Sequence, residues 1–153
     1  NYGGNETGDV MGRERFIEYV LPHYEEAADA LHRKGKLLGS HLDGNNRVWA
    51  DVVARSPLDY VEAFTPAPDS DLSLAQARQL WPDKVLWINF PSSAHLDPLP
   101  RIEQTTRDLL AAVAPGYRFL MSITEDVPEE RWRDNFLAIA RVLDTEGRTP
   151  IAG

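Results

Sequence analysis

The sequence contains no cysteine, fewer basic than acidic residues and no long hydrophobic run. Without cysteine, the chain of 153 residues has no disulfide bonds, no thiolate metal ligands and no cysteine nucleophile. The formal net charge of −8 and the lack of Lys/Arg clusters exclude nucleic acid and anionic membrane surfaces as partners. The apolar runs are too short to cross a bilayer, and no signal peptide precedes them. We therefore expect a soluble, cytoplasmic protein.

Common nucleotide-binding and hydrolase motifs are also missing. The chain has neither G-x-G-x-x-G nor G-x-x-x-x-G-K-[ST], the loops that bind nucleotide phosphates, and no G-x-S-x-G nucleophile turn. Covalent hydrolysis is set aside, because no Ser-His-acid spacing supports it. With 42% hydrophobic and 26% charged residues, the composition is typical of a globular domain with one modest core.

Hydrophobic periodicity predicts one helix followed by four strand-helix units. The first helix is expected over residues 14–32, kinked or restarted at Pro22, with these residues at helical spacing: Phe16, Tyr19, Val20, Tyr24, Ala27, Ala28 and Leu31. Strands are expected over residues 36–42, 59–64, 84–90 and 117–123. The helices that follow them are expected over residues 47–55 with Val48, Trp49, Val52 and Val53 inward, 73–81 capped by Ser73, 101–113 and 129–146.

Strands that alternate with helices indicate an α/β fold with a parallel sheet. Two architectures fit this order. One is a small doubly wound sheet that is complete in itself. The other is half of an eight-stranded (β/α) barrel, whose usual length of about 250 residues exceeds this chain. The chain opens on a polar loop without an initiator methionine, which favours the half-barrel.

In either architecture, polar residues at the carboxyl ends of the strands are the candidates for function. Asn5 and Glu6 would follow a strand that precedes the first helix. The ends of the four expected strands carry, in chain order, His41, Asp43 and Asn45; then Glu62; then Asn89, Ser92, Ser93 and His95; then Thr124, Glu125 and Asp126. The barrel hypothesis would place these side chains around one barrel mouth.

Each group also has a purely structural interpretation, and both interpretations stay open at this point. His41-x-Asp43 followed by Gly44 is a common way to end a strand in a turn. Glu125 and Asp126 suit the positive end of the dipole of the last helix. The serines after the third strand can cap a helix, and His95 can be an ordinary loop residue.

Four segments resemble the C-terminal half of the uroporphyrinogen decarboxylase superfamily, which also includes the cobalamin-dependent methyltransferases. They are F-I-E-Y-V-L-P-H-Y-E-E-A-A-D-A-L-H-R-K-G-K, S-H-L-D-G-N, W-I-N-F-P-S-S and T-E-D-V-P-E-E-R-W-R-D-N-F. Together they span nearly the whole chain. Because members of this superfamily are (β/α) barrels, the resemblance implies that residues 1–153 are the C-terminal half of a single (β/α)8 TIM-barrel domain, whose N-terminal half is absent.

The resemblance also implies a metal site. The zinc-dependent methyltransferase branch uses a His-x-Cys pair at one strand end and a distant Cys at another. These positions fall on His41, Asp43 and Glu125, so carboxylates stand where that branch has thiolates. A histidine with two carboxylates is a legitimate ligand set for Zn²⁺ or a harder divalent metal ion.

The function implied is a metal-assisted methyl transfer between a small-molecule substrate and a corrinoid, carried by a corrinoid protein. The divalent metal would act as a Lewis acid, and Glu62, Asn89 and Asp126 would orient the substrate. One alternative is uroporphyrinogen decarboxylase, a cofactor-independent lyase of porphyrin and heme biosynthesis. A second is a non-catalytic barrel that binds a corrinoid or another partner. The chain alone is expected to be inactive, and to be poorly soluble or a homodimer because its sheet has open edges.

Overall fold

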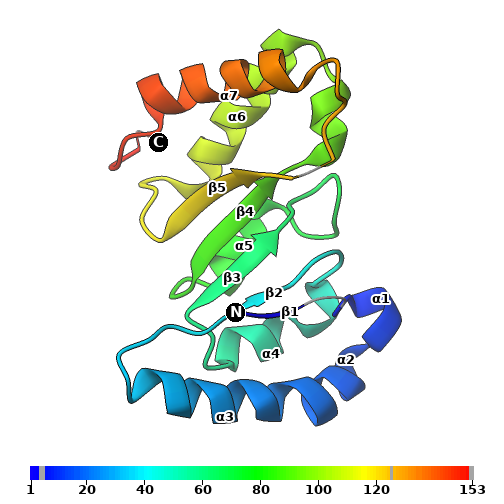
Figure 1. The fold of residues 1–153 in the computed structure, drawn as a ribbon, viewed down its shortest axis with the longest axis vertical. Helices are drawn as coiled ribbons and strands as arrows, with labels where there is room; N and C mark the ends of the chain where they lie inside the picture. The colour runs from blue at the N-terminus through cyan, green and yellow to red at the C-terminus, as the bar shows by residue number, and fades with distance from the viewer. Residues whose placement is uncertain (4–5, 125, 152–153) are drawn as a thin grey trace.

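The computed structural model describes residues 1–3, 6–124 and 126–151 and contains a five-stranded parallel sheet with helices packed beside it (Figure 1). Neighbouring strands follow one another along the chain, in the order β1-β2-β3-β4-β5, and every pair is parallel. The strands are β1 (Tyr2–Gly3), β2 (Gly39–His41), β3 (Tyr60–Phe64), β4 (Val85–Phe90) and β5 (Phe119–Ile123). The four strands expected from the sequence are therefore present, although each is shorter than expected.

The helices predicted from the apolar periodicity are present, and helical turns that were not predicted occur at residues 8–11 and 92–96. They are α1 (Gly8–Met11), α2 (Arg13–Arg15), the π-helical turn η1 (Phe16–Val20), α3 (Leu21–His32), the 3₁₀ turn η2 (Arg47–Trp49), α4 (Ala50–Arg55), α5 (Leu74–Leu80), the 3₁₀ turn η3 (Ser92–Leu96), α6 (Leu99–Val113) and α7 (Trp132–Glu146). Ser73 caps α5 as predicted, in a reciprocal capping box with Gln76. None of the helices in the described part of the chain has the length and apolar character that a membrane span requires.

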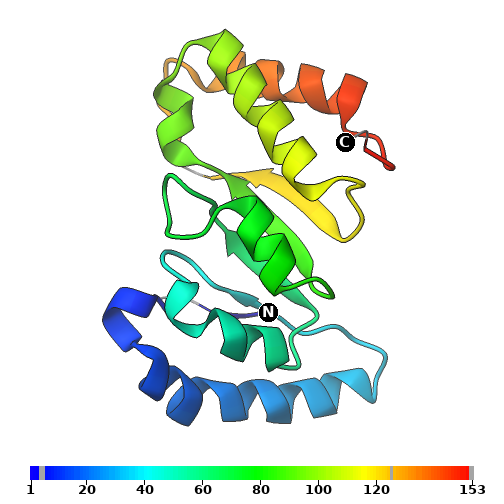
Figure 2. The ribbon, with the colours of Figure 1, turned by 180° about the vertical axis from the view of Figure 1, so that it is seen from behind.

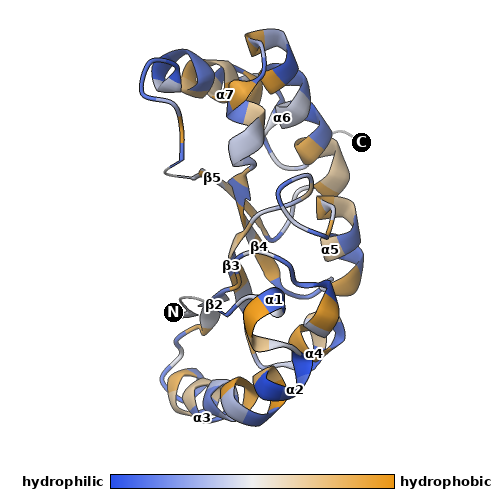
Figure 3. Ribbon diagram, turned by 90° about the vertical axis from the view of Figure 1, so that its right-hand side faces the viewer, coloured by the Kyte–Doolittle hydropathy of each residue, from blue (hydrophilic) through white to orange (hydrophobic). Residues whose placement is uncertain are grey.

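The helices leave one face of the sheet open. Figures 1 and 2 view the molecule from opposite sides, and α5 lies behind the sheet in the first and in front of it in the second. The side view in Figure 3 shows α4, α5 and α6 along one side of the strands. Within the described residues the strand order does not reverse, as it does in doubly wound sheets. An unreversed parallel sheet with these helices is consistent with a partial TIM-barrel-like fold.

The core fills the space between the sheet and the helices that cover it. Leu86, Ile88 and Phe90 alternate along β4 and are fully buried on the covered face. Trp87 points to the open face and is 38% exposed. This alternation follows from the two-residue repeat of a strand. The covered face therefore provides the hydrophobic core, and the open face carries the side chains that a barrel would enclose.

Two residues that the periodicity placed among the buried positions are exposed. Tyr19 is 60% exposed. The π-helical turn η1 adds a residue to the turn, which rotates the apolar face of the helix before α3 begins at Leu21. Val48 is 44% exposed, because residues 47–49 form a 3₁₀ turn in which the 3.6-residue spacing does not apply. The expected restart of the first helix near Pro22 is confirmed, since Pro22 stands in the first turn of α3.

We expect the isolated chain to self-associate through the open face of the sheet. Leu120 is 50% exposed there, on the strand next to Trp87. Leu120→Lys should reduce the self-associated fraction in sedimentation velocity, because a charged side chain would resist burial between two copies. Leu137→Lys on α7, where the leucine is 44% exposed, is the matched control and should change little. A wild-type chain that is monomeric and unfolds cooperatively would contradict this expectation.

Candidate functional site

Polar side chains at the carboxyl edge of the sheet surround one cavity of about 180 Å³. Because parallel strands all end at the same edge, residues distant in sequence meet there. The residues lining this cavity are His41, Asp43, Thr65, Asp69, Asn89, Ser92, Thr124 and Asp126. Six of these eight were expected from their positions at strand ends. We refer to this set as the strand-end cavity.

His41 is paired with Glu62 on the neighbouring strand. The two residues are directly opposite in the register of β2 and β3, and the distance from His41 Nδ1 to Glu62 Oε2 is 3.0 Å. Glu62 Oε2 also accepts a hydrogen bond of 3.0 Å from Asn1 Nδ2. With Nδ1 donating to the carboxylate, Nε2 remains as the ring nitrogen that can bind a metal or a substrate. Glu62 contacts the histidine and is not among the residues that line the cavity, and its expected role toward the substrate stays a prediction.

The turn after β2 has the local geometry that a structural role requires. Asp43 Oδ1 accepts a hydrogen bond of 2.8 Å from the backbone N–H of Gly44, and Gly44 has a φ of +64° that favours glycine. The turn interpretation of this segment is therefore realised. It does not exclude a functional one, because Asp43 also lines the strand-end cavity.

The buried side chain of Asn46 stabilises this turn, and this role was not predicted from the sequence. Its side chain is fully buried and donates hydrogen bonds of 3.0 Å to the carbonyl oxygens of Leu42 and Gly44. Its Oδ1 accepts a hydrogen bond of 2.8 Å from the indole N–H of Trp49. In the sequence Asn46 is one of two adjacent asparagines after a glycine, and no local signal distinguishes the buried one.

Thr65 and Asp69 were also missed, because they lie in the loop between β3 and α5 rather than at a predicted strand end. Asp69 accepts a hydrogen bond of 3.0 Å from the backbone N–H of Ser93 and a second from the Ser93 hydroxyl. This contact ties the loop to η3, which carries Ser92 into the cavity wall. A loop was implied between the strand expected over residues 59–64 and the helix expected over residues 73–81, but the sequence does not indicate which way this loop folds.

The cavity wall is acidic, and none of the described residues that line it is Arg or Lys. Asp126 lines it from the segment after β5, where its backbone N–H contacts Thr124 Oγ1 at 3.4 Å. Two expected site residues, Glu125 and Asn5, lie outside the described residues. Among residues 1–3, 6–124 and 126–151, no group of three His, Asp or Glu side chains is arranged to hold a metal ion. The expected ligand set includes Glu125, so it stays a prediction.

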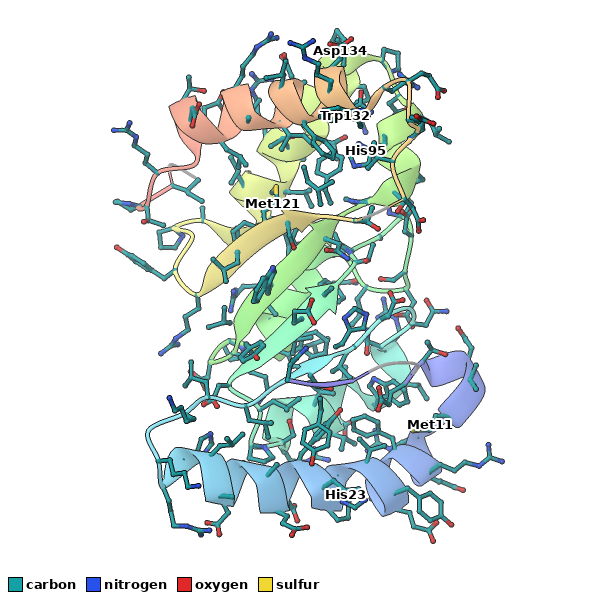
Figure 4. The ribbon with its side chains drawn as sticks, in the orientation of Figure 1. Met11, His23, His95, Met121, Trp132 and Asp134 are labelled. Carbon is teal, nitrogen blue, oxygen red and sulfur yellow. The ribbon has the colours of Figure 1, made fainter. Side chains whose placement is uncertain are left out.

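His95 is not part of the cavity wall and is buried beside α7, where its ring lies near Phe136. Figure 4 shows His95 below α7, beside Trp132, whereas His23 lies on α3 at the other end of the molecule. The side chain of His95 is fully buried against Phe90, with ring centroids 5.1 Å apart. Its backbone oxygen accepts a hydrogen bond of 2.9 Å from Asn135 Nδ2. Burial lowers the pKa of the His95 imidazole, and the nearby positive charge of Arg131 lowers it further.

We expect the stability of the protein to decrease in mild acid because of His95. Below pH about 6.5 the unfolded chain binds a proton at this residue that the folded state resists, so the free energy of unfolding falls. This contribution is absent above that pH and grows as the pH falls toward the lowered pKa. Urea denaturation between pH about 5 and 7 should show a shallower pH dependence for His95→Gln than for wild type. His23→Gln, at an exposed position, should retain the wild-type dependence; equal slopes for all three proteins would contradict the expectation.

Comparisons with known proteins are informative about the fold alone. No protein-family model and no curated protein matches this sequence. Among solved structures, the chain is similar to a methyltransferase from Methanosarcina mazei, with a TM-score of 0.69 and 14% sequence identity. The likeness covers 93% of this chain and 40% of the methyltransferase, so the chain spans less than half the length of that protein. The arrangement of strands and helices described above is thus shared with part of a known methyltransferase.

Proposed function

We propose that this chain forms the C-terminal half of a (β/α)8 barrel of the uroporphyrinogen decarboxylase superfamily. The unreversed parallel sheet supports this, as does the structural likeness that spans 40% of a longer methyltransferase. The open face of the sheet supports it as well, because inward-facing side chains of such a barrel pack in layers against those of the remaining strands. Trp87 and Leu120 would occupy one of these layers.

We further propose that the barrel transfers a methyl group between a small-molecule substrate and a corrinoid. The observation that carries this proposal is the strand-end cavity, in which His41, Asp43, Asn89 and Asp126 gather from three different strand ends. Catalytic sites of (β/α) barrels are built at this edge of the sheet. The likeness to a methyltransferase, together with the four sequence segments, favours methyl transfer over other reactions.

We propose that a divalent metal binds at this cavity. His41 offers Nε2 and Asp43 offers a carboxylate, and Glu125 would complete a set of one nitrogen and two oxygen ligands suited to Zn²⁺ or a harder ion. A bound metal would supply Lewis acidity that polarises or deprotonates the group accepting the methyl. Glu62 would hold the His41 ring through Nδ1, and Asn89 and Asp126 would contact the substrate from the opposite wall.

The other two functions considered from the sequence receive no support. The decarboxylase alternative is without support, because the solved structure to which the chain is similar is a methyltransferase. A non-catalytic barrel is also without support, because the solved structure to which the chain is similar is an enzyme. We therefore propose neither of them.

We expect His41→Ala to lower the affinity for a divalent metal by at least about tenfold, since it removes one of three ligands. Binding is measured by titration with Co²⁺, whose visible absorption reports the ligand environment, and by Zn²⁺ competition. Methyl transfer from methylcobalamin to a thiol, followed by its absorbance, should fall in parallel. His23→Ala on α3 is the matched control. Activity is measured in the complete barrel, because the chain alone is expected to be inactive. If the complete barrel binds no divalent metal and transfers no methyl group, the proposed function is wrong.

A further inference from the structure

We propose that Ser122 is a positioning residue that turns the side-chain amide of Asn89 so that its Nδ2 donates into the strand-end cavity. This inference rests on the proposed function, because it assigns Asn89 a defined role toward the substrate of the same site. Sequence reasoning indicated Asn89 from its place at the end of a strand, but nothing indicated Ser122.

The geometry joins three side chains on the open face of the sheet. Asn89 and Ser122 are directly opposite in the register of β4 and β5. Trp87, two residues before Asn89 on the same face of β4, donates its indole N–H to Ser122 Oγ at 2.8 Å. Ser122 Oγ lies 3.2 Å from Asn89 Oδ1 and 3.0 Å from the carbonyl oxygen of Ile88.

The direction of these hydrogen bonds follows from which groups can donate and which can accept. An indole N–H only donates, so it occupies a lone pair of the Ser122 oxygen. The hydroxyl hydrogen is then directed toward the two neighbouring acceptors, the Ile88 carbonyl and Asn89 Oδ1. With Oδ1 facing Ser122, the two N–H groups of Asn89 are turned away from the serine, toward the cavity that Asn89 lines.

The fixed amide of Asn89 would supply hydrogen-bond donors that the aspartates of this cavity lack. Asp43, Asp69 and Asp126 present acceptor oxygens, so a substrate oxygen or carboxylate placed near them would be repelled. The amide of Asn89 provides hydrogen-bond donors without adding a charge. The structure therefore assigns Asn89 Nδ2 to a hydrogen-bond acceptor of the substrate.

Methyl-transfer kinetics and nuclear magnetic resonance test this assignment together. Asn89→Asp keeps the shape but removes both donors, and should raise KM for the methyl acceptor by about tenfold with a smaller change in kcat. Ser122→Ala should raise KM in the same direction by a smaller factor, and Ser122→Thr, which keeps the hydroxyl, should restore it. Asp144→Asn, at an exposed position on α7, is the control that should change neither constant.

The nuclear magnetic resonance measurement does not depend on methyl-transfer activity. In protein labelled with ¹⁵N at asparagine, the side-chain signals of Asn89 are identified by their loss in Asn89→Asp. They should shift or broaden in Ser122→Ala and return in Ser122→Thr. Unchanged Asn89 signals in Ser122→Ala, or an unchanged KM in Asn89→Asp, would overturn the inference. If instead the wild type transfers no methyl group while the Asn89 signals respond to Ser122, the positioning stands and only the proposed function fails.

Discussion

Replacing Trp49 with alanine is expected to lower the free energy of unfolding by about 4 kcal/mol, the largest effect among the substitutions proposed for this chain. Trp49 is fully buried and stacks on Phe16, with ring centroids 4.5 Å apart and an interplanar angle of 27°. The substitution removes this contact and leaves a cavity between η2 and η1. Urea denaturation monitored by circular dichroism measures the change.

Two further variants separate packing from hydrogen bonding at this position. Trp132→Ala removes a tryptophan that is 49% exposed and should lower the free energy of unfolding by about 1 kcal/mol or less. Trp49→Phe keeps an aromatic ring against Phe16 but loses the indole N–H that contacts Asn46, so its effect should be intermediate. Equal losses for the two alanine variants would show that the stack between Phe16 and Trp49 does not stabilise the fold as its burial implies.

Asn46→Ala should lower the free energy of unfolding by about 3 kcal/mol, the second largest effect. It leaves the indole N–H of Trp49 and the carbonyl oxygens of Leu42 and Gly44 without their asparagine partner. Each buried group that loses its partner destabilises the fold by about 1–3 kcal/mol, and partial relaxation reduces the sum. The same turn carries His41 and Asp43, so the variant should also weaken metal binding at the proposed site.

The neighbouring asparagine is the matched control for this variant. Asn45 makes one side-chain hydrogen bond, to Asp9, in an exposed setting, and Asn45→Ala should change stability by about 0.5 kcal/mol or less. A double variant, Asn46→Ala with Trp49→Phe, should be less destabilised than the sum of its parts, because both changes remove the same hydrogen bond. Similar losses for Asn45→Ala and Asn46→Ala would contradict the role assigned to the buried residue.

The regular elements of the fold were predictable because each has a local cause. The alternation of Leu86, Ile88 and Phe90 with Trp87 is a two-residue repeat that only a strand satisfies. Ser73 followed by Gln76 predicts the start of α5, since both residues cap the same turn. The errors at Tyr19 and Val48 arose where the backbone departs from the α-helix, in a π-helical and a 3₁₀ turn that apolar spacing does not reveal.

The site was predictable only in part, for a different reason. Strand ends could be located along the chain, and parallel pairing then brings His41, Asn89 and Asp126 to one edge. Which side chain contacts which was not predictable. The register of β2 and β3 places Glu62 on the His41 ring. Asp69 reaches the cavity from a loop whose path is set by its contact with Ser93.

The sequence by itself therefore determined the order of elements, the parallel sheet and the edge at which polar residues collect. These properties depend on how apolar and polar residues are spaced along the chain and on the tendency of apolar side chains to be buried. Both can be read from the sequence without knowing any tertiary contact. The tertiary structure alone decided that His41 is oriented by Glu62, that Asn46 supports the turn and that Ser122 faces Asn89. The first and third contacts join neighbouring strands, so they form only after the sheet has brought the partners within hydrogen-bonding distance. The Asn46 contacts are local in the sequence, but they require the buried rotamer that the folded turn imposes.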